Sequence, residues 1–201
     1  MLQTSDPSSN DIKNRLRQSL RDKRSKLSAA TRIAWNESIG RQVLKLVESY
    51  NAKSIACFSP FNGEPDITPA YQHLMASGCQ LALPVISAGP DHAMEFHHWR
   101  ANARMVTNKY GILEPVGGQA VALADFDMLI LPLVGYDRHG NRLGMGSGYY
   151  DRHLESLRYA DRPLRVGLAY CLQEIAPVDK NIWDIPLHGV VNERGWFTFV
   201  P

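Results

Sequence analysis

The chain has 201 residues and a mass of 22.5 kDa, a length that predicts a single domain with its own core. Its composition, with 44% hydrophobic and 21% charged residues, excludes a collagen, a coiled coil and a fully disordered protein. The formal net charge is +2, but residues 11–32 hold eight of the 22 basic residues and two of the 20 acidic ones. The other residues, 14 basic and 18 acidic, carry a net charge of −4.

No apolar stretch reaches the roughly 18 residues that span a membrane, and the polar start of the chain lacks the apolar core of a signal peptide. The cysteines Cys57, Cys79 and Cys171 are far apart and match no zinc-binding spacing. We interpret them as small buried residues in a reducing compartment, and we expect a cytoplasmic protein.

Two helices are predicted first, after a disordered tail at residues 1–8. The first covers residues 9–27, and the second starts at a Ser28 cap and ends near Tyr50. Their apolar sides consist of Ile12, Leu16, Leu20 and Leu27 on the first helix and Ile33, Ile39, Val43, Leu44 and Val47 on the second.

Short apolar strands then alternate with helices. The predicted strands are 54–58, 80–83, 94–99, 128–134, 165–170, 190–191 and 196–199, and the predicted helices are 66–77 and 149–159. We expect Pro84 to end the second strand, and residues 103–124 to be irregular. This alternation predicts an α/β fold with a mainly parallel sheet, in which ligands bind beyond the carboxyl ends of the strands.

The densest functional signal is a glycine-rich loop between an apolar strand and a helix, with Gly140, Gly144, Gly146 and Gly148. Glycines let the backbone approach a ligand closely, and backbone N–H groups beside a helix start can bind an anion. The loop matches neither GxxxxGK[ST] nor GxGxxG, so phosphate binding and a simple turn both stay open.

Polar side chains flank this loop. Arg142 could neutralise phosphate charge, and one ring of the adjacent Tyr149 and Tyr150 could stack on a ligand. Asp151 either interacts with the helix dipole or holds Mg²⁺ through phosphates.

The first helix carries Lys13, Arg17, Arg21 and Arg24 on one face. Three interpretations are open: a solvated face, a nucleic-acid surface, or cations that reach a phosphate on the glycine loop. No aromatic residues interleave with these cations, which argues against nucleic acid.

Two further loops and one segment near the end hold isolated polar residues. Glu64 follows the first strand, Tyr110 and Glu114 lie in the segment 108–115, and Asp184 is partnered structurally or holds a metal. His92, His97 and His98 lack metal-ligand spacing, and we interpret them as surface or strand-edge residues.

The motif GNRLGMGSGYYDRHL resembles the signature of the 5-formyltetrahydrofolate cyclo-ligase family. The segments KNRLR, NGEPD, YGILEP, RVGLAYCLQ and WDIPLHGVV resemble other family motifs, in the family's order, from about residue 11 onwards. The resemblance implies a three-layer α/β domain over residues 9–201. It also implies conversion of 5-formyltetrahydrofolate to 5,10-methenyltetrahydrofolate with ATP and Mg²⁺, through a phosphorylated formyl oxygen.

The resemblance also implies roles for particular residues. Arg142 and Tyr149 would be catalytic, Asp151 and Asp184 would hold Mg²⁺, and Ser59, Glu64 and Tyr110 would contact the folate. The ATP site would comprise Lys13, Asn14, Arg15, Leu16, Arg17, Arg142, Leu143, Gly144, Met145, Gly146, Ser147, Gly148, Tyr149 and Tyr150. Met145 and Ser147 depart from the Arg and the Gly or Lys frequent in the family, which lowers the number of cations in the loop.

Two other functions are kept beside this one. A nucleic-acid-binding module would use the basic helix, with salt-sensitive binding. A sugar-phosphate isomerase or transferase would act without ATP. We expect a reduced folate and ATP as small-molecule partners, no nucleic acid or membrane partner, and a monomer.

Overall fold

The structure is a computed structural model that describes residues 9–86, 93–178 and 184–199. Its main sheet comprises β1 (Ser54–Ala56), β2 (Gln80–Ile86), β3 (Met94–Trp99), β6 (Ala120–Val121), β7 (Met128–Pro132), β10 (Leu164–Leu168), β11 (Gly189–Asn192) and β12 (Gly195–Thr198). Two small hairpins stand apart, formed by β4 (Met105–Thr107) with β5 (Leu113–Pro115) and by β8 (Gly135–Tyr136) with β9 (Arg142–Leu143). The helices are α1 (Ser9–Ser25), α2 (Ala29–Ser49), α3 (Thr68–Ala76) and α4 (Tyr149–His153), with 3₁₀ turns at Leu123–Asp125, Glu155–Leu157 and Cys171–Gln173.

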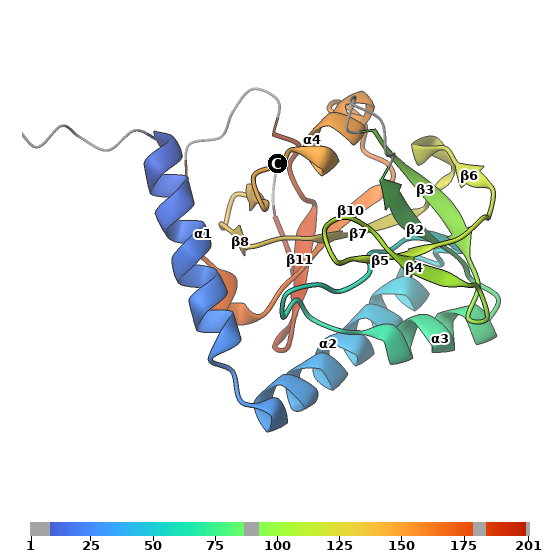
Figure 1. The fold of residues 1–201 in the computed structure, drawn as a ribbon, viewed down its shortest axis with the longest axis horizontal. Helices are drawn as coiled ribbons and strands as arrows, with labels where there is room; N and C mark the ends of the chain where they lie inside the picture. The colour runs from blue at the N-terminus through green and yellow to red at the C-terminus, as the bar shows by residue number, and fades with distance from the viewer. Residues whose placement is uncertain (1–8, 87–92, 179–183, 200–201) are drawn as a thin grey trace, which may run out of the picture.

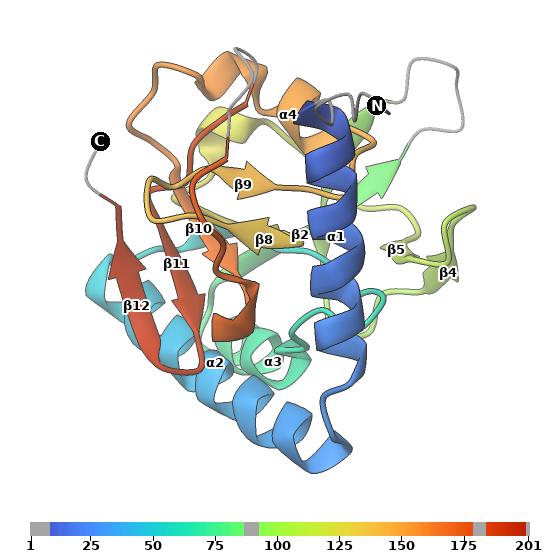
Figure 2. The same ribbon diagram turned by 90° about the vertical axis from the view of Figure 1, so that its left-hand side faces the viewer.

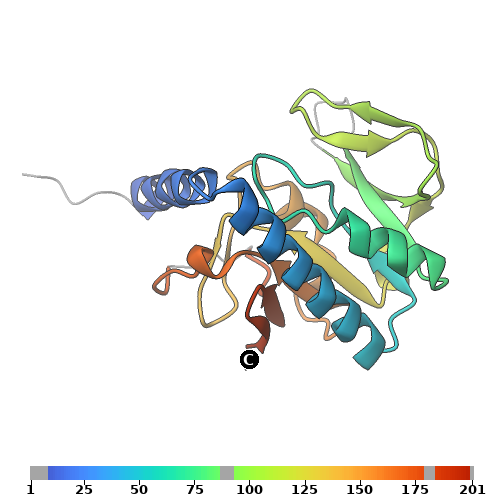
Figure 3. The same ribbon diagram turned by 90° about the horizontal axis from the view of Figure 1, so that it is seen from below.

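The strand order in the main sheet is β12-β11-β10-β7-β1-β2-β3-β6. The five strands from β11 to β2 run parallel, whereas β12, β3 and β6 pair antiparallel at the edges. Helices α2 and α3 cover one face, and α4 lies on the other (Figure 1, Figure 3). The prediction of a mainly parallel sheet flanked by helices is confirmed.

The central strand β7 shows how the sheet is held between these layers. Its Met128 and Ile130 belong to the apolar cluster on the α2–α3 side, and Leu129 and Leu131 belong to the cluster under α4. Since successive side chains alternate between faces, a strand covered on both sides is apolar at every position. This explains the uninterrupted apolar run from which the strand was predicted.

Helix α1 stands apart from the other helices, against the β8–β9 hairpin (Figure 2). Its apolar contact is a small cluster in which Leu20 packs against Val134 and Leu143. The predicted apolar stripe is wrong at Ile12, which is 46% exposed, because the inward side of α1 is largely cationic. On α2, which begins at the predicted Ser28 cap, Ile33 is 60% exposed and so is not part of the apolar side.

Three further predictions need correction. Strand β2 continues through Pro84 to Ile86, because beyond Ala82 it pairs only with β3 and the proline sits where β1 no longer runs alongside. The segment 103–124 contains β4, β5 and β6 rather than irregular chain. Helix α4 ends at His153, and the following 3₁₀ turn buries Leu157 beside Leu154.

The predicted tail at residues 1–8 and His92 lie outside the described residues. His97 and His98 are half-buried on β3, near the sheet edge as expected, and His97 contacts Glu95. Within the described ranges, no helix combines the length and the apolar character that crossing a membrane requires.

Candidate active site

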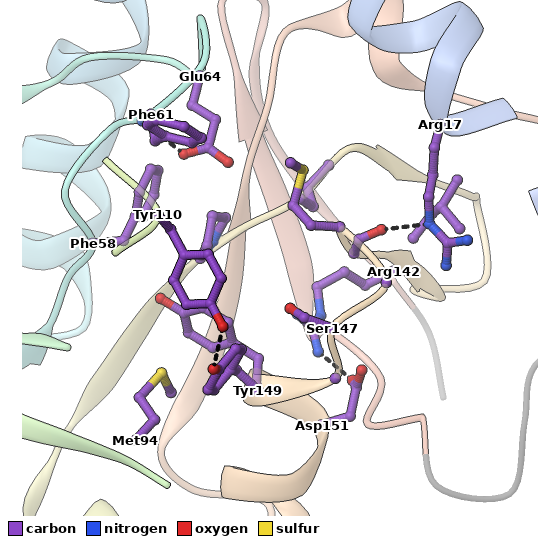
Figure 4. Close-up of a pocket in the computed structure, with 18 of the residues that line it drawn as sticks. Arg17, Phe58, Phe61, Glu64, Met94, Tyr110, Arg142, Ser147, Tyr149 and Asp151 are labelled. Atoms are coloured by element: carbon purple, nitrogen blue, oxygen red, sulfur yellow. Dashed lines mark hydrogen bonds and ion pairs between the residues drawn. The ribbon is translucent and has the colours of Figure 1, made fainter. Parts of the chain in front are cut away.

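A cavity of about 850 Å³ opens beyond the carboxyl ends of β1, β2 and β7. Ligand sites in parallel α/β sheets occur at this edge, and the volume lies in the upper part of the usual range of about 300–1,000 Å³. The glycine-rich loop and α1 line one side of the cavity. The loop after β1 and the β4–β5 hairpin line the other (Figure 4).

The side formed by α1 and the glycine loop is rich in charge. Three cations line it, Lys13 and Arg17 from α1 and Arg142 from β9, together with the carboxylates of Asp151 and Asp184. Lys13 is buried, with 8% of the residue exposed. A group of cations and carboxylates in a sheltered cleft suits a phosphate ligand and a divalent cation better than a neutral ligand.

The glycine loop is tied directly to α1. The Arg17 Nε atom donates a hydrogen bond of 2.9 Å to the carbonyl oxygen of Gly144. Gly146 has φ of 102° and Gly148 has φ of 70°, in the left-handed region that favours glycine. The alternating glycines therefore serve the backbone path of the loop along the cavity.

Asp137 fixes the turn from which Arg142 emerges. This carboxylate is fully buried and accepts hydrogen bonds from the backbone N–H groups of His139 and Asn141, at 2.9 and 3.0 Å, and from the Asn141 side chain at 2.8 Å. Such local bonds are characteristic of Asx turns, for which the DRHGN segment carried a recognisable signal. Asp137 was not among the predicted site residues.

Arg142 forms an ion pair with Asp151 at the start of α4. The guanidinium carbon of Arg142 also lies 5.6 Å from the centre of the Tyr150 ring, within cation–π range. Burial raises the pKa of the Tyr150 hydroxyl, so this group stays protonated at neutral pH. The two residues predicted to act on phosphate and metal therefore adjoin each other (Figure 4).

The four cations predicted on one face of α1 do lie on one side, but that side faces inward. Lys13 and Arg24 are buried, and Arg17 and Arg21 are half-buried. The interpretation of this face as solvated is wrong, because only 1% of Arg24 is exposed. An inward-facing set of cations also leaves little of this face for a nucleic-acid backbone.

Glu64 lies on the opposite side of the cavity, in the loop after β1. One of its carboxylate oxygens accepts a hydrogen bond of 3.0 Å from the backbone N–H of Phe61. Burial raises the pKa of Glu64 to about 7, although the Phe61 hydrogen bond and the charge of Arg24 act in the opposite direction. Ser59 donates a hydrogen bond of 2.6 Å to the carbonyl oxygen of Leu113, which joins this loop to β5.

A pair of tyrosines connects the β4–β5 hairpin to α4. The hydroxyl groups of Tyr110 and Tyr149 are 2.7 Å apart, and their rings meet edge to face (Figure 4). Inside the hairpin, the buried Glu114 carboxylate accepts hydrogen bonds from the side chain of Asn108, at 2.6 Å, and from the backbone N–H of Ile86, at 3.0 Å. These bonds hold the hairpin beside the cavity.

The structure gathers most of the predicted site residues around this one cavity. Those that line it are Lys13, Asn14, Arg17, Ser59, Glu64, Tyr110, Arg142, Leu143, Gly144, Met145, Gly146, Ser147, Gly148, Tyr149, Tyr150, Asp151 and Asp184. Arg15 and Leu16 do not line it, because the helix turns Arg15 to solvent and Leu16 into the cluster around Leu20.

The apolar lining was missed by the sequence analysis. Phe58, Phe61, Ile86, Met94 and Ile112 border the cavity around Glu64 and Tyr110. Phe58 and Phe61 lie in the segment that follows β1, Ile86 ends β2, Met94 begins β3 and Ile112 lies in the β4–β5 turn. Apolar residues at strand ends look like core residues in a sequence, so only the assembled sheet reveals their position.

Comparison with known proteins places the chain in a family. Residues 9–193 match the model of the 5-formyltetrahydrofolate cyclo-ligase family. The 5-formyltetrahydrofolate cyclo-ligase of Haemophilus influenzae is 33% identical over 178 residues, which cover 88% of this chain and 95% of that protein. The Escherichia coli protein of the same name is 33% identical over 162 residues, covering 77% of this chain and 88% of its own length.

The fold leads to the same group of enzymes. The NMR structure of Aquifex aeolicus 5,10-methenyltetrahydrofolate synthetase superimposes with a TM-score of 0.81 and 31% identity, and the match covers 94% of each chain. The ordered motifs, the α/β architecture and these relatives agree with one another. The chain therefore belongs to the 5-formyltetrahydrofolate cyclo-ligase family of ligases.

Proposed function

We propose that this enzyme converts 5-formyltetrahydrofolate to 5,10-methenyltetrahydrofolate in an Mg²⁺-dependent reaction that cleaves one ATP to ADP and phosphate, the phosphate taking its fourth oxygen from the formyl group. The observation that carries the proposal is the two-sided cavity. Cations and carboxylates gather against a glycine loop on one side, and an apolar surface with a buried carboxyl group faces them. The charged side matches the phosphates of a nucleotide, and the apolar side matches a flat heterocycle.

The charged side suits the triphosphate. Lys13, Arg17 and Arg142 would neutralise phosphate oxygens, while the backbone of residues 144–148 approaches the chain of phosphates. Phosphoryl transfer needs positioned oxygens and neutralised charge more than covalent help from the protein. Arg142, the cation that adjoins the predicted metal ligand, would stabilise the charge on the transferring group.

Asp151 and Asp184 fit a phosphate-bound Mg²⁺ in their chemistry. This ion prefers oxygen ligands, and it is usually held by one or two carboxylates together with substrate phosphates and waters. Both carboxylates border the phosphate side of the cavity. When bound, the ion would offset charge on the β- and γ-phosphates, and Asp151 would then exchange its Arg142 partner for the metal.

The chemical sequence follows from the substrates. The formyl oxygen attacks the γ-phosphorus, so that an O–P bond forms and the bond to the ADP oxygen breaks. Nitrogen 10 then attacks the activated carbon, loses its proton, and phosphate leaves with the former formyl oxygen. Closure of the cavity by the Tyr110–Tyr149 pair would limit hydrolysis of the phosphorylated intermediate by water.

The apolar side suits the reduced pterin. Ionised Glu64 would accept hydrogen bonds from pterin N–H groups, and Tyr110 with Phe61 would contact the ring system. Tyr149 spans the two sides, near the place where the formyl group would meet the phosphate. We also propose that the enzyme acts as a cytoplasmic monomer, in a compartment that keeps its three cysteines as free thiols.

An activity assay with single omissions tests the proposal. The purified protein should produce the absorbance of a methenyl folate from 5-formyltetrahydrofolate, ATP and Mg²⁺. No product should form without ATP or in the presence of a chelator. Absence of product from protein with a native circular dichroism spectrum would refute the function, and product without ATP would favour an isomerase or transferase.

A matched pair of variants tests the phosphate side. Arg142→Ala should lower the turnover number at least tenfold, because it removes a cation that lines the cavity. Arg138→Ala removes an exposed cation four residues earlier and should leave turnover within twofold. Equal losses in the two variants would mean that the loop responds only to total charge.

A further inference from the structure

Arg24 is a buried arginine outside the cavity. It lies at the end of α1 with 1% of its surface exposed, and it is not among the residues that line the cavity. Removing a guanidinium group from water is costly unless other groups compensate its charge and its N–H donors. The solvent-exposed Lys23 and Lys26 beside it bear no such cost.

The contacts of Arg24 lead to the loop that carries Glu64. Its Nη2 atom donates a hydrogen bond of 2.8 Å to the carbonyl oxygen of Asn62. Its Nε and Nη1 atoms are buried without a hydrogen-bond partner within the described residues. Burial lowers the pKa of Arg24, and the nearby Glu64 carboxylate is the main opposite charge that counteracts this effect.

The turn before Glu64 is tight and is held by a second arginine. Asn62 and Gly63 both have left-handed backbones, with φ of 51° and 75°. Arg32 on α2 donates one hydrogen bond of 3.3 Å to the Gly63 carbonyl and another of 3.2 Å to the Arg24 carbonyl. Two guanidinium groups thus hold the two carbonyls that immediately precede Glu64.

The charged and titratable groups around Glu64 come from two further elements. Arg24 on α1 favours the ionised carboxylate, and Tyr150 on α4 also interacts with it. The Phe61 N–H completes the set from the loop itself. Arg24 is the cation in this set, so it offsets the burial that favours the protonated acid.

We propose that Arg24 is a positioning residue. It holds the Asn62–Gly63 turn through the Asn62 carbonyl and supplies the positive charge that favours the ionised Glu64 carboxylate for binding the pterin. The inference rests on the proposed function, which assigns the pterin to Glu64. It gives a role to a cation at the far end of the helix whose first turns carry Lys13 and Arg17. One helix thereby serves both sides of the cavity.

The test compares Arg24→Met with Lys23→Met, which removes the neighbouring exposed charge. Binding of 5-formyltetrahydrofolate is measured by calorimetry without ATP between pH 6 and 9, and the KM values for folate and ATP are measured separately. We expect Arg24→Met to raise the folate KM at least fivefold at pH 7 and to leave the ATP KM within twofold. Lys23→Met should match the wild type.

A carboxyl titration followed by NMR uses ¹³C-labelled glutamate, with Glu64→Gln for assignment. It distinguishes an effect of Arg24 on Glu64 from a general loss of folded structure. Arg24→Met should raise the midpoint of Glu64 by about one pH unit. Arg24→Lys keeps the charge but not the forked donor, so it should leave the midpoint nearly unchanged while still weakening folate binding. In the Glu64→Gln background, Arg24→Met should add little further loss.

Two outcomes would overturn the inference. One is an unchanged Glu64 midpoint in folded Arg24→Met, and the other is an equal rise of the folate and ATP KM values. If Arg24→Met does not fold, a wild-type folate KM in Arg24→Lys overturns it as well. Failure of the wild type to bind folate would instead refute the proposed function, and the NMR midpoint would still decide whether Arg24 acts on Glu64.

Discussion

Lys13, Glu64 and Glu114 are ionisable side chains that the walls of the cavity almost completely bury. Each such group lowers stability unless a partner compensates it. Glu114 has two hydrogen-bond donors within the protein, whereas the hydrogen bond to Glu64 comes from one backbone N–H. Of these two carboxyl groups, Glu64 thus has fewer hydrogen bonds within the described residues, which suits the role of binding a ligand.

The raised pKa of Glu64 makes a prediction about stability. The folded state binds this proton more tightly than the unfolded chain, in which the pKa is near 4.5 rather than about 7. The free energy of unfolding should therefore fall as the pH rises through this window. Denaturant unfolding of wild type and Glu64→Gln should show that the variant gains roughly 2 to 3 kcal/mol relative to wild type between pH 5 and pH 8. A constant difference would contradict the raised pKa.

Asp151 gives a prediction about metal dependence. Asp151→Asn should lower Mg²⁺-dependent turnover at least about tenfold, a barrier increase of roughly 1.4 kcal/mol. It removes a charged oxygen ligand and leaves Arg142 without its ion-pair partner. Turnover measured over an Mg²⁺ titration checks this, with the exposed Asp125→Asn as control. If Asp151→Asn keeps the wild-type turnover at low Mg²⁺, Asp151 does not bind the metal and serves only to pair with Arg142.

At the scale of elements, periodicity predicted the long helices and the buried strands well. It failed where contacts distant in sequence decide the outcome. The segment 103–124 contains strands because β6 pairs with β3 and β4 pairs with β5, which its local composition does not indicate. The orientation of α1 was missed for a similar reason, since its inward side is set by Gly144 and Asn62 rather than by apolar spacing.

The candidate site likewise contains residues that were predicted from the sequence and residues that were not. The glycines, the cations and acids such as Asp151 each had a structural alternative in the sequence, and the family resemblance was what placed them together in one predicted site. Phe61 and Met94 were not predicted, because an apolar residue in the loop after a strand or at a strand start is indistinguishable in sequence from a core residue. Arg24 was missed because burial of a charge depends on a partner loop 38 residues away.

A helix-breaking substitution tests whether α1 supports both sides of the cavity. Ser19→Pro replaces an exposed residue between Arg17 and Arg24 and should cost the helix about 3 kcal/mol. Because α1 shares only a small apolar cluster with the rest of the protein, the sheet should stay folded. We expect the KM values for both ATP and folate to rise, with Ser19→Ala close to wild type. Loss of only one of the two would mean that the ends of α1 act independently.

At the scale of the whole molecule, the sheet edge at β11 and β12 is packed so closely that glycine is required at one position. A Cβ atom at Gly189 would collide with the Trp196 ring and with the Phe197 carbonyl oxygen. Overpacking of this kind typically costs 1–3 kcal/mol, about 2–4 °C of melting temperature per kcal/mol at this size.

We therefore expect Gly189→Ala to lower the melting temperature by about 4 °C or more. Gly40→Ala is the matched comparison, because a Cβ there would make ordinary van der Waals contacts with Ala70, 3.4 Å away, and Ile67, 4.0 Å away, and alanine favours the helix. That variant should melt at or above the wild-type temperature. Calorimetry measures both melting temperatures. Equal values for Gly189→Ala and Gly40→Ala would show that β11 and β12 accommodate the added Cβ atom without loss of stability.

The bond between Arg17 and Gly144 joins residues 127 positions apart. A ribosome makes α1 early, yet Gly144 is added only after about seven-tenths of the 201-residue chain has been synthesised. Until then Arg17 lacks the carbonyl oxygen that it binds in the finished protein. The Arg24 end of α1 can reach Asn62 early in synthesis, whereas the Arg17 end must wait for Gly144. A truncated chain that ends before the glycine loop therefore lacks the partner that completes the phosphate side of the cavity.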